Sequence, residues 1–298
     1  NYSTLDYLQR IIFASKDLSD MMQYPLKYAM MCMCSQLGFH IATFCKENAC
    51  FPSHEHVDYL VALASGLLSF GINIDATSVR LKLCGLGMEL GKYDLTETCL
   101  QHIGDYCMRF IYSVTVDSTP STMVLDCNSH SFFERLSIKR FSTEELLQTQ
   151  VSSTVIFTPS EVSIAPTPLR MEMFRSIVAP PQLRLEHHHF WYDWGVVDSL
   201  ICLYFFQYLN FSRQGKLRHK QVAIDNMFNV IRTEPHLLHR ETALNLLGYS
   251  FTLENQLTNA FICFTQSLKI RPYHNAAKFY LALLFKRVLT TQRRAVHY

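Results

Sequence analysis

The sequence predicts an all-α fold in which antiparallel helix pairs stack into an α-solenoid, with an irregular middle segment. Apolar residues recur at spacings of three and four along most of the chain, which is the period of one helix face. The 298 residues include only 10 Gly and 10 Pro, so residues that interrupt helices are scarce. A hydrophobic content of 49% against 17% charged residues indicates a folded chain.

The clearest helix pair covers residues 241–273. Its first helix carries Leu244, Leu247, Gly248 and Phe251 on one face, and its second helix, after a break at 254–256, carries Ala260, Phe264 and Ser267. Gly248 opposite Ala260 would remove side-chain bulk and let the two helices approach closely. Pro272 ends the second helix, because it has no N–H and disfavours helical geometry at Arg271.

This pattern resembles the tetratricopeptide repeat, a unit of roughly 34 residues with the motif W-x2-L-G-x2-Y, then A-x3-F, then P. Leu247 and Gly248 match the L-G pair, Leu244 and Phe251 replace the Trp and the Tyr, and Ala260, Phe264 and Pro272 match in identity and offset. An ordinary helical hairpin is the alternative. A single repeat cannot bury its apolar faces, so the resemblance implies neighbouring copies.

Weaker copies are expected near residues 77–110, 194–237 and 275–298. The first has Leu83, Cys84, Thr96 and Leu100 at the motif positions; the second has Ala223, Met227 and Pro235, after a helix 194–209; the third has Leu281, Ala282 and Phe285, with a partner helix from Val288. The second copy fits only if its turn carries a few extra residues. The first has no closing Pro.

The chain divides into N-terminal helical repeats (1–112), a Ser/Thr/Pro-rich segment (113–182) and C-terminal repeats (183–298). The middle segment is either a linker or insertion, or it folds back in part along the solenoid. Residues 153–157 and 162–165 alternate as strands do. Thr119, Thr158 and Thr167 each precede a Pro, which suits proline-directed phosphorylation of a phosphoprotein; chance in such a composition explains the three pairs equally well.

No chemical motif points to catalysis. G-x-S-x-G, H-E-x-x-H and Walker sequences are absent, so we expect no enzyme, no catalytic residue and no cofactor. Two Cys and two His at Cys45, Cys50, His54 and His56 could hold zinc, but their spacing favours a loop. The 10 scattered Cys are interpreted as reduced thiols, which places the protein in the cytoplasm or nucleus. No apolar run reaches the roughly 18 residues of a membrane span.

The resemblance implies a protein-interaction scaffold or adaptor, a subunit of a larger assembly, whose first helices line a concave groove. The groove would present Thr242, Asn245, Tyr249 and Thr252 in the best repeat and Ala276, Phe279 and Leu283 in the next. This mixture predicts an apolar partner segment or another subunit. Alanine at Tyr249 and Phe279 should then weaken partner binding without lowering the melting temperature.

Two further surfaces are candidates. Trp191 and Trp194, in an aromatic run, are expected either to pack or to form a protein-binding hot spot. RNA binding by a helical repeat is the alternative function. It would use the basic residues Arg213, Lys216, Arg218 and Lys220, but a net charge of +2 makes nucleic acid an unfavoured partner.

Overall fold

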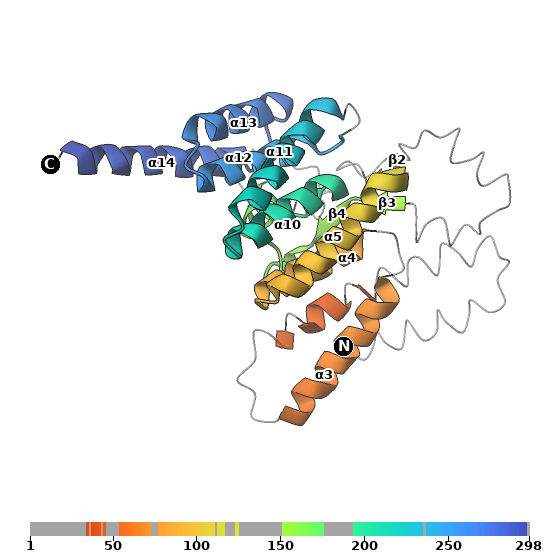
Figure 1. The fold of residues 1–298 in the computed structure, drawn as a ribbon. Coiled ribbons are helices and arrows are strands. Elements are labelled where there is room, and N and C mark those ends of the chain that lie inside the picture. The colour runs from red at the N-terminus through yellow and green to blue at the C-terminus, as the bar shows by residue number, and fades with distance from the viewer. Residues whose placement is uncertain are drawn as a thin grey trace.

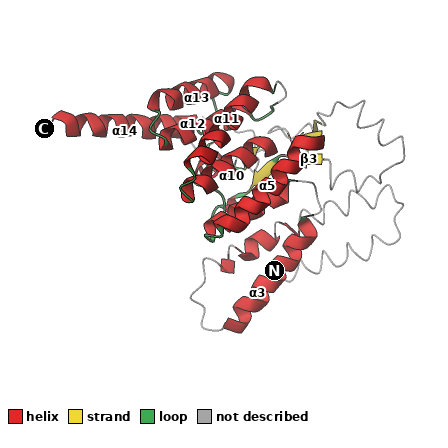
Figure 2. Cartoon of the chain, viewed as in Figure 1, coloured by secondary structure: helices red, strands yellow, loops and turns green. Residues whose placement is uncertain are grey.

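The computed structural model describes residues 34–35, 37–42, 44–45, 54–72, 77–110, 112–116, 123–124, 151–175, 193–234 and 237–296. Most of them are helical, which confirms the predicted all-α class (Figure 1, Figure 2). The helices are α3 (His54–Gly71), α4 (Ser78–Glu89), α5 (Tyr93–Phe110), α8 (Thr167–Met173), α10 (Ser199–Arg213), α11 (Leu217–Thr233), α12 (Arg240–Leu253), α13 (Leu257–Ile270) and α14 (Ala277–Val296), with a 3-10 turn at Pro159–Glu161. None of these described helices is both long and apolar enough to cross a membrane.

Three helix pairs, α4–α5, α10–α11 and α12–α13, are joined by turns of one form. Each turn has three residues, and its middle residue has a positive φ: 70° at Gly91, 70° at Gly215 and 60° at Asn255. Gly reaches this region without a Cβ penalty, and Asn tolerates it. The next residue donates its N–H to the carbonyl five positions earlier, at 2.8–2.9 Å. The recurrence of this turn shows that one helix-pair geometry is used three times.

The pair α10–α11 follows this geometry in a register that differs from the predicted one. The motif alignment gave Ala223 the position in its helix pair that Ala260 has in α12–α13, and this alignment required a longer turn. The turn has the standard length, so Lys220 stands five residues beyond its centre, where Ala260 stands in α12–α13. The mismatch arises because Ala223 lies one helical turn further along the same buried face.

The last helix also departs from the expectation. A break was predicted before Val288, but α14 is continuous from Ala277 to Val296 and projects beyond the other helices in Figure 1. Its sequence contains no Gly or Pro, and residues of good helix propensity such as Ala, Leu, Lys and Arg dominate it. Nothing local therefore ends the helix within that span.

Short strands form two small sheets. Strands β1 (Tyr112–Val116), β2 (Met123–Val124) and β3 (Val151–Ser153) form one, in the order β2-β1-β3, and β4 (Val155–Phe157) pairs antiparallel with β5 (Gly195–Val197). The extended prediction for 153–157 is confirmed. The prediction for 162–165 is wrong, because the Glu161 carbonyl accepts the N–H groups of Ile164 and Ala165 and closes a turn. Strand β5 also explains why α10 begins at Ser199 and not at Trp194.

The main core joins all three parts of the chain. One cluster contains Leu81 and Leu100 from α4–α5, Phe157 and Leu169 from the middle segment, and apolar side chains of α10 to α13. Residues 151–175 therefore fold back onto the helices, which is the second of the two alternatives for this stretch. Within this core Lys82 of α4 and Glu161 form an ion pair, with Nζ 2.7 and 3.0 Å from the two carboxylate oxygens.

Candidate protein-binding groove

The face that the resemblance assigns to a ligand is covered by the chain itself. Helix α8 packs against α12, and the Tyr280 hydroxyl donates to the Pro168 carbonyl at 2.9 Å. Asn245 Nδ2 donates to Glu172 Oε1 at 2.8 Å. Helix α8 thus lies along α12 and the start of α14, where a partner segment was expected.

A buried polar network fixes this arrangement. Asn245 Nδ2 also donates to Asn275 Oδ1 at 3.0 Å, and Asn275 Nδ2 donates to the Ser267 carbonyl at 3.0 Å. Glu172 and Arg175 are 1% and 4% exposed, with their charged atoms 3.9 Å apart. Burial raises the pKa of Glu172 to about 7 and lowers the pKa of Arg175, because both charged forms lose hydration.

The predicted partner-binding residues are divided by the fold. Thr242 and Asn245 are 2% and 0% exposed, so this arrangement places them in the interior. Tyr249, Thr252, Phe279 and Trp194 are half-buried. Leu283 is exposed, and Trp191 lies outside the described residues. The structure brings Thr242, Asn245 and Tyr249 onto one face of α12, and that face meets α8 and β5.

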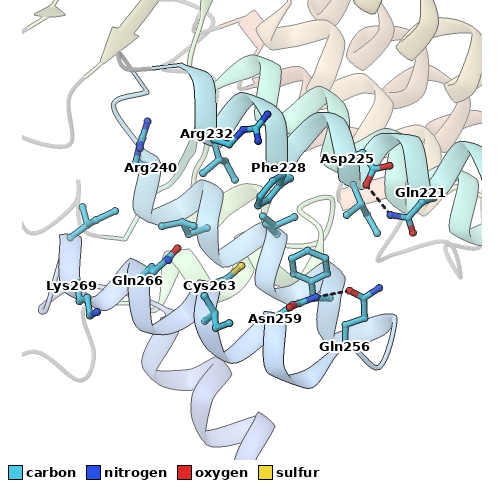
Figure 3. A pocket seen from close by; sticks show the side chains of 17 residues that line it. Gln221, Asp225, Phe228, Arg232, Arg240, Gln256, Asn259, Cys263, Gln266 and Lys269 are labelled. Carbon is cyan, nitrogen blue, oxygen red and sulfur yellow. Dashed lines mark hydrogen bonds between the residues drawn. The ribbon is translucent and has the colours of Figure 1, made fainter.

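A groove open to solvent lies along the opposite face of α12, between α11 and α13 (Figure 3). Leu244, Leu247 and Phe251 follow one another at spacings of three and four, and around the helix axis they lie about 100°, 160° and 120° from Asn245. They form the floor of the groove, which has a volume of about 920 Å³. The walls are Gln221, Ile224, Asp225, Phe228, Ile231, Arg232 and Arg240 on one side and Gln256, Asn259, Ile262, Cys263, Gln266, Lys269 and Ile270 on the other.

The rim of the groove leaves apolar surface in contact with water. Phe228 is 47% exposed, Ile262 45% and Ile270 49%. Sequence reasoning missed these three residues, because it assigned each second helix only one apolar face. The signal was available: in α13, Phe261 and Ile262 directly precede the core residues Cys263 and Phe264, so apolar residues extend around more than one face.

The two ends of the groove differ in charge. Arg232, Arg240 and Lys269 gather at one end, at the close of α11, the start of α12 and the close of α13 (Figure 3). Asp225, the only acidic residue among the described ones that line the groove, lies towards the other end and accepts a hydrogen bond from Gln221 at 3.0 Å. At that end Asn259 also donates to Gln256 at 2.9 Å. The groove is therefore apolar along its length, basic at one end and amide-rich at the other.

Other candidate residues have structural partners. Lys216 pairs with Glu97, and Lys220 Nζ lies 2.7 Å from Glu254 Oε2, so acidic neighbours offset part of the basic turn proposed for RNA. The Thr158 hydroxyl donates to Glu161 at 3.0 Å and caps the 3-10 turn, whereas Thr167 is exposed at the start of α8.

The remaining predicted positions lie largely outside the described part of the chain. These are Thr119, Cys50 and the side chains of His54 and His56. Among the described residues, no group of three or more His, Cys, Asp or Glu side chains is placed to hold a metal ion.

No protein family model, curated protein or solved structure matches this chain. The resemblance to the tetratricopeptide repeat therefore stays a prediction, and a function for the chain has to be inferred from the geometry of the groove.

Proposed function

We propose that this chain is a non-catalytic interaction scaffold that binds an amphipathic helix of a partner protein in the groove between α11 and α13. One observation carries the proposal: a groove with an apolar floor and partly exposed apolar rims lies on the side of α12 that the chain's own middle segment leaves open. Exposed apolar surface rimmed by polar residues is typical of protein interaction sites.

The dimensions of the groove suit a short helix. Helix α13 has 14 residues and is therefore about 21 Å long at 1.5 Å per residue. A partner helix of similar length, with apolar residues at i, i+3, i+4 and i+7, would lay its apolar side against the exposed rim residues Phe228, Ile262 and Ile270, above the buried floor. Helix-in-groove recognition of this kind derives most of its affinity from a few buried apolar anchors.

The charge of the groove specifies one end of that helix. Arg232, Arg240 and Lys269 would face acidic residues of the partner, and the negative end of the helix dipole favours the same placement. We therefore assign to the partner helix a C-terminal end that carries Asp or Glu and lies beside these three cations.

A second copy of this chain fits less well. Helix α14 exposes apolar side chains, with Leu283, Phe285 and Leu289 each more than half exposed. It carries no acidic residue and several basic ones. Its insertion would place like charges against the basic end of the groove, so charge complementarity favours a different partner.

The test compares proteins captured by affinity purification from cells that make this chain. Ile262→Asp places a charge on the groove rim, and Leu217→Asp is the matched control, because Leu217 is 69% exposed and lies outside the groove. Melting curves verify that both variants fold. We expect a partner retained by the wild type and by Leu217→Asp to be lost with Ile262→Asp. Identical capture by all three proteins would contradict the proposal.

A further inference from the structure

Two cysteines face each other across the hairpin α4–α5. The turn is centred on Gly91, and Gly87 and Thr96 lie on either side of it in contact: a Cβ on residue 87 would be 2.5 Å from Thr96 Oγ1. In an antiparallel pair, one further helical turn on each side brings Cys84 of α4 opposite Cys99 of α5. The electrostatics agree, because the side-chain interaction with Cys84 is the largest influence on the pKa of Cys99 and lowers it.

The two thiols have opposite environments. Cys84 is 2% exposed and belongs to the main core, whereas Cys99 is exposed on α5. The side-chain interaction with Cys84 lowers the pKa of Cys99 to about 6, and the same interaction, together with burial, raises the pKa of Cys84. An exposed thiolate beside a protonated thiol is the arrangement of an attacking cysteine with its resolving partner.

The hairpin keeps the two sulfurs at a level where the helices pack closely. The equivalent level of α12–α13, counted from the turn centre, holds Gly248 and Cys263, and there a Cβ on residue 248 would lie 2.6 Å from Phe264, the residue that follows Cys263. A disulfide joins cysteines whose Cα atoms lie about 4.4–6.8 Å apart, so a closely packed hairpin is the setting in which Cys84 and Cys99 can be linked.

We propose that Cys84 and Cys99 form an oxidisable dithiol that a hydroperoxide converts into a disulfide linking α4 to α5. The Cys99 thiolate attacks the peroxide, so that an S–O bond forms, the O–O bond breaks and hydroxide or alkoxide leaves. The Cys84 sulfur then attacks the resulting sulfenic acid: the S–S bond forms, the S–O bond breaks, and the thiol proton leaves with the hydroxyl group as water. The two thiols lose two electrons and the peroxide gains them.

The experiment uses the full reduced chain and dilute hydrogen peroxide at pH 7. After timed exposure, free thiols are blocked with N-ethylmaleimide in denaturant and the protein is digested with trypsin. Cleavage after Lys82, Lys92 and Arg109 yields peptides 83–92 and 93–109. We expect mass spectrometry to find these two joined, with fragmentation placing the link at Cys99 and not at Cys107, before Cys263 is oxidised.

Two variants separate the steps. Cys99→Ser should abolish the linked peptide, whereas Cys84→Ala should leave Cys99 as a sulfenic acid that dimedone traps. Circular dichroism verifies the fold of each. Oxidation of Cys99 no faster than that of the buried Cys263, or sulfenic acid accumulating on Cys99 in the wild type without any link to Cys84, would overturn the proposal. Should Cys84→Ala fail to fold, the linked peptide in the wild type and its loss in Cys99→Ser decide the question alone.

Discussion

Asn245 and Glu172 are hydrogen-bonded at 2.8 Å although 73 positions separate them in the sequence. This contact attaches the middle segment to the C-terminal helix pairs and closes the face of α12 that a partner was expected to occupy. It also keeps a carboxyl group in the interior, where the guanidinium of Arg175 lies 3.9 Å away. The protonation of Glu172 therefore couples the fold to pH.

Stability should fall as the pH rises from about 4.5 to 7. Burial raises the pKa of Glu172 to about 7 in the folded chain from an ordinary value of 4.5. Between these values the folded chain holds a proton that the unfolded chain has released, so deprotonation favours unfolding, by up to about 3 kcal/mol. In urea titrations, the free energy of unfolding of Glu172→Gln should fall less between pH 4.5 and pH 7 than that of the wild type. Glu234→Gln, which alters an exposed carboxylate, is the control; equal losses in all three proteins would contradict the assignment.

Gly248→Ala should destabilise the protein by about 1–3 kcal/mol, although Ala is the better helix former. The new Cβ would lie 2.6 Å from Cε1 of Phe264, and that ring stacks on Tyr280 with centroids 5.0 Å apart, so it has little room to move. Gly66→Ala is the control, because no described atom lies within 4 Å of its added Cβ; it should stabilise α3 by about 0.5–1 kcal/mol. Thermal melts measure both. A neutral Gly248→Ala would mean that the two helices separate easily.

Lys82→Met should cost about 3–5 kcal/mol, because it leaves the Glu161 carboxylate buried without its cation. The side chains of this pair are 9% and 1% exposed, and Lys82 Nζ also lies 5.4 Å from the ring centroid of Phe39. Glu161→Gln keeps the acceptor for Thr158 but removes the charge. The double variant Lys82→Met/Glu161→Gln should therefore recover most of the loss in denaturant unfolding, and a simple sum of the two single effects would argue against coupling.

The parts of the fold that the sequence predicted are those set by local spacing. Leu244, Leu247 and Phe251 mark a helix face within eight residues, so the helix pair around 254–256 was visible in advance. Contacts between distant segments were not visible: nothing near Trp194 indicates that residues 195–197 pair with β4 and delay α10. The groove was missed for a different reason. Apolar residues such as Ile262 repeat with the same period whether they face a core or a partner.

Tyr249→Ala should destabilise the fold by about 2–4 kcal/mol, which differs from the effect predicted from the sequence. The Tyr249 ring lies 6.4 Å from Phe205 and 6.1 Å from Tyr280, between α10 and α14, and burial raises the pKa of its hydroxyl. Leu283→Ala, at a site 52% exposed, should change stability by less than about 0.5 kcal/mol. Chemical denaturation of the two variants measures both stability changes. A stable Tyr249→Ala protein would return Tyr249 to the list of partner contacts.

Charge reversal at the basic end of the groove should weaken the proposed complex chiefly through its association rate. Arg232→Glu and Lys269→Glu replace cations at the ends of α11 and α13 and would repel an acidic helix end. Once a partner helix is identified, its binding measured by surface plasmon resonance at 50 and 300 mM salt should show a loss of roughly tenfold that shrinks at the higher salt. Lys286→Glu changes an exposed cation of α14 outside the groove and serves as the control.

If Lys286→Glu weakens the complex as much as the groove variants do, long-range attraction and not the local basic end explains the effect. If no variant matters, the partner helix lies in the groove without the acidic end assigned to it.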